Sequence, residues 1–281
     1  MLAFLAVVIP LGLDLYLPFP EDNPLTAEKI EVGRRLFFDR RLSRDGSIAC
    51  SSCHDPERAY SDGRPVAVGV LGRRGRRNSP ALINRGYGRL FFWDGRMATL
   101  EEQVLKPIED PNEMDLPLPE AAARVGLAPG EISRALASFV RSILSGDAPF
   151  DRFINGDRAA LSAGQQAGLQ VFRGQGNCVA CHVGPNFSDE RLHNTGVAWR
   201  DGNFADLGAG KGNFKTPTLR EIARTAPYMH DGSLSTLEDV IEYYDRGGNR
   251  NPHLDSELRP LHLSTEEKNN LVLFLRSLSA R

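Results

Sequence analysis

Two Cys-x-x-Cys-His motifs constrain this chain more than any other feature of its sequence. One turn of helix in such a motif places two thiols beside a porphyrin, and the adjacent histidine reaches the iron. Four cysteines in two pairs also suit zinc, but these pairs are far apart and a histidine directly follows each. A disulfide within either pair would be strained, and a thioredoxin-like pair needs a strand-rich context. We therefore expect two covalent haem c groups, attached at Cys50, Cys53, Cys178 and Cys181, with His54 and His182 as proximal iron ligands.

The composition is that of an ordinary soluble protein. Hydrophobic residues make up 41% and charged residues 25% of the 281 residues, and the formal net charge is −2. A chain of this length can form two compact domains, each with its own core. Nothing basic or repetitive in it indicates a nucleic-acid partner.

A weak internal repeat surrounds the two motifs. In each copy, a segment with a glycine and a phenylalanine precedes the cysteines, and an aromatic-Ser-Asp turn follows them. The matching segments are Gly33 to Phe37 with Tyr60-Ser61-Asp62, and Gly168 to Phe172 with Phe187-Ser188-Asp189. Duplication of one small haem domain explains this pattern. We predict an N-terminal haem domain at residues 23–155 and a C-terminal haem domain at residues 156–281.

The first 22 residues are set apart from these domains. They open with the apolar run MLAFLAVVIPLGL, which is too short to span a bilayer unless it is extended. The run resembles the core of a secretory signal, although a basic start and a small-x-small cleavage site are missing. The segment is interpreted as a signal or anchor remnant, or as a buried N-terminal arm. Covalent haem c is attached outside the cytoplasm, so we expect an exported, periplasmic protein.

Helix signals dominate the rest of the chain. Capping boxes that predict helix starts occur at Thr99–Glu102, Ser162–Gln165 and Ser264–Glu267. Pro107 is expected to stop the first of these helices. Apolar residues at helical spacing predict another helix over residues 131–144, and Thr236 predicts the start of a helix that ends at Gly247. The predicted fold class is mostly α, with two cytochrome c-type domains and long loops.

The sixth ligand of each iron decides whether it transfers electrons or binds a small oxidant. No histidine lies between His54 and His182, so Met97 and Met114 are the remaining candidates in the first domain. The second domain offers His193, Met229, His230, His253, His262 and its tyrosines. Tyr244 shares one helical face with Leu237, Val240 and Ile241. It is therefore either an ordinary core aromatic or an iron ligand.

Several further motifs resemble those of the bacterial di-haem cytochrome c peroxidases and the related MauG proteins. They are Arg77-Asn78-Ser79-Pro80, Phe92-Trp93-Asp94-Gly95-Arg96, Thr216-Pro217-Thr218-Leu219-Arg220 and Ala226-Pro227-Tyr228-Met229-His230. The resemblance covers nearly the whole chain from Asn23 onwards. It implies a peroxidatic N-terminal haem, an electron-storing C-terminal haem, and one calcium ion between the two domains.

The resemblance also implies roles for individual residues. Trp93 matches the tryptophan that lies between the haems. Glu113 matches the acid/base of the distal pocket, Gln103 matches its neighbour, and Pro107 matches a residue of the pocket wall. Such an acid/base is needed because peroxide cleavage moves a proton from one oxygen to the other. The calcium positions, whose oxygen donors suit that ion, are matched by Asn78, Thr225 and Pro227.

Two departures from the peroxidase pattern are those of the MauG branch. Where typical members have a displaceable distal histidine, this chain has Gly69, Gly72 and Gly75. The methionine ligand of the second haem is matched by Tyr244, and a phenolate favours high oxidation states of iron more than a thioether does. We therefore expect the first haem to be open and the second to be closed by Tyr244.

The expected function is that of a di-haem peroxidase that reduces hydrogen peroxide to water at the N-terminal haem. Its electrons would come through the C-terminal haem from a small cytochrome c or a cupredoxin. One alternative is a MauG-like oxidase that acts on tryptophans of a partner protein. A second alternative is a di-haem electron carrier without catalytic activity. An N-terminal membrane anchor and a homodimer are left open.

Overall fold

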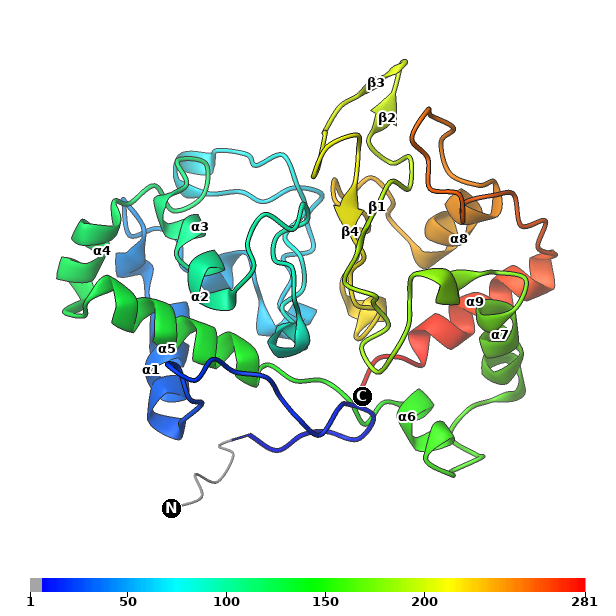
Figure 1. Ribbon diagram of the computed structural model, residues 1–281, viewed down its shortest axis with the longest axis horizontal. Coiled ribbons are helices and arrows are strands. Elements are labelled where there is room, and N and C mark those ends of the chain that lie inside the picture. The colour runs from blue at the N-terminus through cyan, green and yellow to red at the C-terminus, as the bar shows by residue number, and fades with distance from the viewer. Residues whose placement is uncertain (1–6, 281) are drawn as a thin grey trace.

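The computed structural model describes residues 7–280, and its helices fall into two groups with long loops between them (Figure 1). The first group contains α1 (Ala27–Phe37), α2 (Leu100–Gln103), α3 (Lys106–Glu109), α4 (Leu118–Val125) and α5 (Pro129–Ser142). The second contains α6 (Pro149–Ile154), α7 (Ala163–Arg173), α8 (Leu237–Asp245) and α9 (Thr265–Arg276). Short 3₁₀ helices cover Arg40–Leu42, Cys50–Ser52, Pro56–Arg58, Val70–Gly72, Arg85–Tyr87, Cys178–Ala180 and Ile222–Arg224. The prediction of a mostly helical chain is confirmed.

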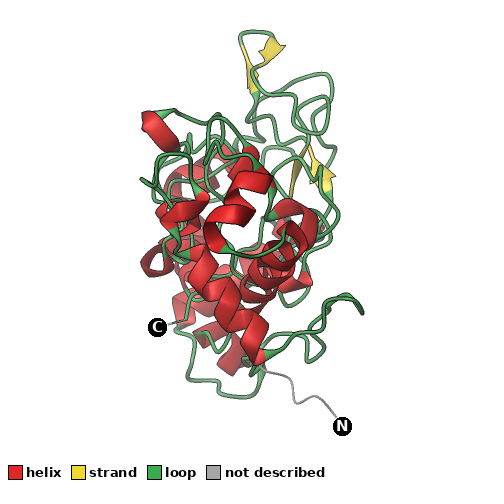
Figure 2. Ribbon diagram, turned by 90° about the vertical axis from the view of Figure 1, so that its left-hand side faces the viewer, coloured by secondary structure: helices red, strands yellow, loops and turns green. Residues whose placement is uncertain are grey.

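The strands are short and lie in the second half. β1 (Leu192–His193) pairs antiparallel with β4 (Phe214–Lys215), and β2 (Trp199–Arg200) pairs antiparallel with β3 (Asn203–Phe204). The β2–β3 hairpin projects beyond the helices in both views (Figures 1 and 2). A T-shaped contact between Trp199 and Phe204, with ring centroids 4.7 Å apart, stabilises its tip.

The predicted helix starts are confirmed by capping hydrogen bonds. The side chains of Thr99, Ser162, Thr236 and Ser264 accept backbone N–H groups at the starts of α2, α7, α8 and α9. One prediction was wrong: Pro107 does not stop the helix that begins after Thr99. That helix ends at Gln103, and Pro107 lies in the first turn of α3, where its missing N–H costs no hydrogen bond.

Each half is built on one pair of packed helices. In the first half α1 crosses α5, and a Cβ at Gly33 would lie 2.8 Å from the Cβ of Phe139. In the second half α7 crosses α9, and a Cβ at Gly168 would lie 2.8 Å from the Cβ of Phe274. Only glycine permits so close an approach of two helices.

The aromatic residues beside these glycines repeat the same arrangement. The rings of Phe37 and Phe139 are 5.0 Å apart at 56°, and those of Phe172 and Phe274 are 5.1 Å apart at 58°. Each pair belongs to a separate hydrophobic core, one formed from residues between Leu36 and Ile143 and the other from residues between Phe150 and Leu278. The two helix pairs therefore pack in closely similar ways.

The N-terminal segment lies along both halves. Leu13 and Leu17 are buried, and the carbonyl of Asp14 accepts the Tyr87 hydroxyl at 2.7 Å in the first half. The carbonyl of Leu11 accepts the N–H of Asp147 at 2.8 Å, close to the start of α6. From residue 7 onwards the segment is thus an arm packed on the protein, whereas residues 1–6 of the predicted signal or anchor lie outside the described residues. No helix within residues 7–280 has the length and apolar character needed to cross a membrane.

Candidate haem-binding cavity and active site

One cavity of about 840 Å³ runs between the two halves and reaches both Cys-x-x-Cys-His motifs. Cys53 and His54 line it from the first half, and Cys178, Cys181 and His182 line it from the second. Each motif begins with a short 3₁₀ helix, Cys50–Ser52 or Cys178–Ala180, which turns the following histidine toward the cavity.

The two motif histidines are held in the same way. The Nδ1 of His54 lies 3.0 Å from the carbonyl oxygen of Tyr60, and the Nδ1 of His182 lies 2.8 Å from that of Phe187. Burial lowers the pKa of both imidazoles, so each is neutral at pH 7. A neutral imidazole that donates its Nδ1–H to a carbonyl presents Nε2 as the free ligand atom.

The carbonyl acceptors were not predicted from the sequence, although a signal for them was present. Tyr60 and Phe187 are the aromatic residues of the two repeated aromatic-Ser-Asp turns. The turn therefore brings a backbone carbonyl back to the histidine, and the aromatic ring packs into the adjacent core.

The cysteines fit thioether attachment better than metal ligation. Burial raises the pKa of Cys50 to about 12, of Cys53 to about 11 and of Cys178 to about 12. Thiolates are the form that binds metals or reacts in redox pairs, and these buried thiols stay protonated at pH 7. Together with the apolar cavity and the two oriented imidazoles, they provide the donor set and the space that two haem c groups require.

The residues predicted for the distal pocket of the first haem come together. Glu113, Gln103 and Pro107 all line the cavity on the side of His54. Burial raises the pKa of Glu113 to about 7, and the charge of Asp110 adds to this effect. A carboxyl group with this pKa can both accept and return a proton near neutral pH.

A glycine explains how the Glu113 segment is placed. Residues 67–77 form a tight loop in which Gly69 packs on the backbone of Asn112 and Glu113. The N–H of Val70 donates to the carbonyl of Glu113 at 2.8 Å. A Cβ at Gly69 would lie 2.7 Å from the Cα of Glu113, which is closer than real side chains approach. This loop is therefore a backbone support for Glu113.

The other candidate ligands of the first haem are occupied elsewhere. Met114 is buried in the first core, and Met97 packs against that same core. Their sulfur atoms therefore contribute to packing.

Tyr244 lines the cavity in the second half together with Leu237, Val240 and Ile241, the other residues of its predicted face on α8. Burial raises the pKa of its hydroxyl well above its usual range. Tyr243 lies on another face of the same helix, and its hydroxyl donates to the carbonyl of Thr195 at 2.8 Å. The two neighbouring tyrosines thus lie in different surroundings.

Two of the remaining candidates in the second half, His193 and His230, are held by other contacts. His193 is bound between Asp255 at 2.6 Å and Asp189 at 2.9 Å. Contacts with Cys181, Asp255 and Asp189 raise the pKa of His193 to about 10, so it stays protonated. His230 stacks on Phe214, with ring centroids 3.7 Å apart. Met229 lines the cavity, whereas His253 and His262 are exposed.

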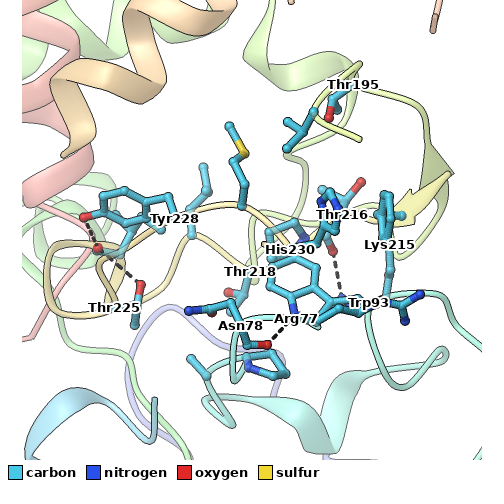
Figure 3. A pocket seen from close by; sticks show the side chains of 18 of the residues that line it. Arg77, Asn78, Trp93, Thr195, Lys215, Thr216, Thr218, Thr225, Tyr228 and His230 are labelled. Atoms are coloured by element: carbon cyan, nitrogen blue, oxygen red, sulfur yellow. Dashed lines mark hydrogen bonds between the residues drawn. The ribbon is translucent and has the colours of Figure 1, made fainter. Parts of the chain in front are cut away.

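Trp93 lies where the two halves meet (Figure 3). Its indole Nε1 donates to the carbonyl of Asn78 at 2.8 Å, and its own carbonyl accepts the N–H of Lys215 in β4 at 2.7 Å. The N–H of Asn78 donates to the carbonyl of His230 at 2.7 Å. The indole ring is therefore fixed by hydrogen bonds that reach both halves of the cavity.

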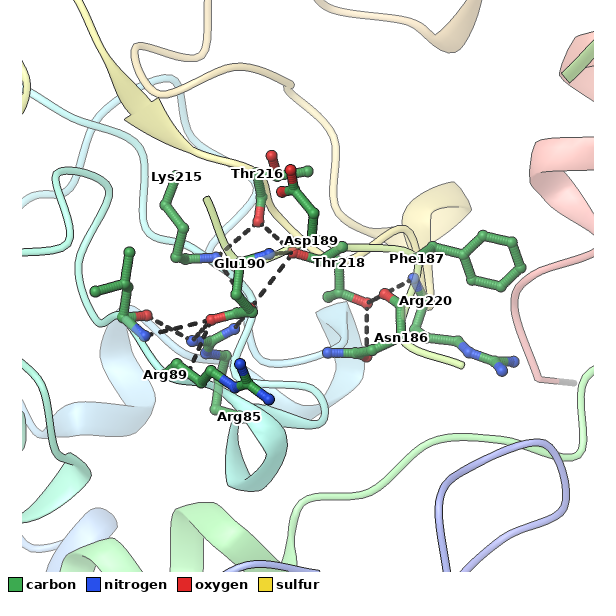
Figure 4. Close-up of polar contacts among 12 residues, drawn as sticks. Arg85, Arg89, Asn186, Phe187, Asp189, Glu190, Lys215, Thr216, Thr218 and Arg220 are labelled. Carbon is green, nitrogen blue, oxygen red and sulfur yellow. Dashed lines mark hydrogen bonds and ion pairs between the residues drawn. The ribbon is translucent and has the colours of Figure 1, made fainter. Parts of the chain in front are cut away.

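Two groups of charged residues, both at least partly buried, join the halves and were not predicted from the sequence. Arg77 binds Asp206 through two hydrogen bonds of 2.8 and 2.9 Å and also binds Asp94 at 2.7 Å. Arg85 binds Glu190 at 2.8 and 3.2 Å, and Lys215 lies 3.5 Å from the same carboxylate (Figure 4).

The pKa values of Lys215 and Glu190, in the second of these groups, are strongly shifted. Burial and the charge of Arg85 lower the pKa of Lys215 to about 7. Although burial opposes ionisation of Glu190, the charges of Arg85 and Lys215 lower its pKa to about 2. No motif or spacing marks these residues, because they meet only in the folded chain.

The three calcium positions implied by resemblance belong to the wall of the same cavity. Asn78, Thr225 and Pro227 all line it. The amide nitrogen of Asn78 donates to the carbonyl of Arg64 at 2.7 Å, which turns the amide oxygen the other way. Neutral oxygen donors of this kind suit calcium.

Comparison with known proteins gives consistent matches. Residues 27–131 match the family described as di-haem cytochrome c peroxidase. The chain is 39% identical to the methylamine utilization protein MauG of Methylorubrum extorquens, over 94% of this chain and 81% of that protein. It is 35% identical to the cytochrome-c peroxidase IdrP1 of a Pseudomonas species, over 93% of this chain and 83% of that one. A crystal structure of a MauG-like protein associated with microbial copper homeostasis superposes with a TM-score of 0.85 at 33% identity, covering 98% and 94% of the two chains.

Proposed function

Because the chain belongs to the di-haem cytochrome c peroxidase family, we propose that it reduces hydrogen peroxide to water at a haem held by His54. The family implies two haem c groups and an oxidoreductase that uses peroxide. The observation that carries the proposal is the position of Glu113. It is a buried carboxyl group with a pKa of about 7 that shares the cavity with His54.

The first site acts through its acid/base and its walls. When bound, the haem would supply the redox centre that binds peroxide and delivers the two electrons needed to cleave the O–O bond. Glu113 would accept a proton from one peroxide oxygen and return it to the other, so that one peroxide, two electrons and two protons yield two waters. The neutral amide of Gln103 orients the peroxide, and Pro107 closes the wall of the pocket.

The second site stores and supplies electrons. His182 and Tyr244 would hold the iron of a haem attached to Cys178 and Cys181, and this haem would supply the electron-storing centre. Trp93, hydrogen-bonded to both halves, carries oxidising equivalents between the two sites. A calcium ion at Asn78, Thr225 and Pro227 holds the interface on which this path depends.

The two haem domains correspond to residues 23–155 and 156–281 and arose by duplication. The matching Gly33–Phe139 and Gly168–Phe274 contacts and the matching histidine–carbonyl bonds support this assignment. The electron donor is a small cytochrome c or a cupredoxin, and the protein works in the periplasm.

A second candidate function is oxidation of tryptophan residues on a partner protein. It is favoured by the 39% identity to a MauG protein and by the position of Tyr244 in the cavity wall. A partner that is oxidised in this way would replace the small electron donor, with the same chemistry at the first site.

Electron paramagnetic resonance of the ferric holoprotein, before and after one equivalent of peroxide, tests the proposal. We expect one high-spin and one low-spin haem, and rapid loss of both signals on addition of peroxide. Two low-spin haems whose resonance signals do not change on addition of peroxide would instead identify an electron carrier. Glu113→Gln should slow the reaction at least 10²-fold, and the exposed Glu109→Gln on α3 serves as a matched control. A Glu113→Gln variant that reacts at the full rate would remove this residue from the mechanism.

A further inference from the structure

We infer that Arg220 is a positioning residue for His182, because it holds the loop whose carbonyl fixes the imidazole of the second haem. This inference rests on the proposed role of His182 as an iron ligand. It concerns a residue outside the cysteine motifs, 38 positions from that histidine in the sequence.

Arg220 is one of the most deeply buried side chains of the molecule. It is 1% exposed, and its partner Asp151 is fully buried, with 2.6 Å between Nη1 and Oδ2. Asp151 also accepts the N–H of Ala148 at 2.9 Å, which fixes it at the start of α6. A charge pair removed from water to this degree keeps its geometry, because either charge left alone would be very unfavourable.

The rest of the guanidinium group binds the loop behind His182. Its Nε donates to the carbonyl of Pro185 at 2.8 Å, and its Cζ lies 5.3 Å from the centre of the Phe187 ring. Its Nη2 donates to the carbonyl of Gly12 in the N-terminal arm at 3.1 Å. One planar group with several N–H donors can satisfy all of these acceptors at once, which an ammonium group cannot do.

Thr218, two residues before Arg220, holds the middle of the same loop. Its hydroxyl is 2.7 Å from the carbonyl oxygen and 2.9 Å from the side-chain oxygen of Asn186 (Figure 4). Residues 185–187 are therefore fixed at both Pro185 and Asn186 by the segment that ends at Arg220. The next carbonyl, that of Phe187, is the one that accepts the Nδ1–H of His182 at 2.8 Å.

The loop of the first haem site has no buried charge pair within the described residues. There the carbonyl of Tyr60 belongs to a loop closed on itself by hydrogen bonds from Asp55 N–H to Ser61 and from Tyr60 N–H to Asp55. Both arginines that contact this loop are exposed: Arg58 lies 3.8 Å from Asp55, and Arg224 donates to the carbonyl of Glu57 at 3.1 Å. The two proximal histidines thus have the same hydrogen bond but different anchors.

This difference affects the iron through the histidine. A short, well-aligned bond from Nδ1–H to a fixed carbonyl makes the imidazole a stronger donor, which stabilises the oxidised metal and lowers its reduction potential. If the loop moves, that bond lengthens and the potential rises. Arg220 therefore helps to set the low potential of the second haem, while the first haem is unaffected.

The test uses the holoprotein with Arg220→Lys, which keeps the buried charge, and with the double variant Asp151→Asn/Arg220→Gln, which removes both charges. The midpoint potential of each haem is measured by optical redox titration, together with the low-spin resonance signal. We expect the potential of the second haem to rise and its signal to broaden in both variants, while that of the first haem stays unchanged. Arg141→Lys is the control, since Arg141 is 5% exposed and binds Glu101 at 2.6 and 2.8 Å in the other half.

The control should lower the thermal midpoint without changing the potential of the second haem. If Arg220→Lys lowers the thermal midpoint in the same way but leaves the second potential and signal as in the parent protein, Arg220 is only a structural residue. That result would leave the proposed function intact, because the parent protein would still react with peroxide. A parent protein that fails to react with peroxide would instead overturn the proposed function.

Discussion

The contact between Gly69 and the Glu113 segment makes a strong prediction about catalysis. Gly69 has φ −91° and ψ −162°, which any residue can adopt, so only steric contact restricts this position. A Cβ there would lie 2.7 Å from the Cα of Glu113 and still closer to the carbonyl oxygens of Asn112 and Glu113. Carbon atoms in contact prefer about 3.5–4.0 Å, so Gly69→Ala must displace the Glu113 segment by roughly 1 Å.

This displacement should affect activity more than stability. Overpacking costs about 1–3 kcal/mol, and loss of the Val70–Glu113 hydrogen bond costs about 1 kcal/mol more. A misplacement of about 1 Å in a reacting group can slow a reaction on the order of 10²-fold. We therefore expect Gly69→Ala to fold, to keep both haems, and to react with peroxide about two orders of magnitude more slowly.

Stopped-flow absorbance with excess peroxide measures this rate, and Gly75→Ala in the same loop is the control. A Cβ at Gly75 would lie 3.5 Å from the Cβ of Ala67, an ordinary contact, so this variant should react as the parent does. Equal rates for Gly69→Ala and the parent would refute the idea that the loop supports Glu113. Equal slowing in both variants would show that the loop tolerates no added side chain, whatever its contact with Glu113.

Four further predictions follow from the site. Because burial raises the pKa of Glu113 to about 7, the base form of Glu113 is lost as the pH falls below 7, and the rate of reaction with peroxide should fall with it. Stopped-flow rates between pH 5 and 9 measure this step, which should be absent in Glu113→Gln. Tyr244→Phe should abolish the low-spin resonance of the second haem, whereas Tyr243→Phe should lower stability by about 1–3 kcal/mol and keep that resonance. Chelation of calcium should slow electron transfer between the haems, and added Ca²⁺ but not Mg²⁺ should restore the rate in the same optical assay. Gly168→Ala should lower the free energy of unfolding by about 1–3 kcal/mol in urea titrations of the holoprotein.

Much of the fold was predictable because its signals are local. A capping residue such as Ser162 acts on the N–H groups of its own helix, so the sequence around it predicts the helix start. The error at Pro107 arose because proline is compatible both with the end of one helix and with the first turn of the next. Such an ambiguity is settled by the path of the chain, and here α3 begins directly before the proline.

The haem-facing residues were predictable for a different reason. The two Cys-x-x-Cys-His motifs are contiguous, and Tyr244 follows from one helical face. By contrast, Arg85 binds Glu190 and Arg77 binds Asp206 across the two halves of the chain, and no periodicity relates these partners. These ion pairs form only when the two halves of the chain pack against each other.

The asymmetry of the two haem sites is largely a property of these long-range contacts. Both histidines make the same bond to a carbonyl, and both helix pairs pack in the same way. The first site differs because Gly69 supports the backbone of Glu113, whose side chain lines the cavity. The second differs because buried charges fix the loop behind its histidine and a tyrosine lies in its cavity wall. The same histidine–carbonyl bond therefore stands in two different surroundings, because the long-range contacts around each motif differ.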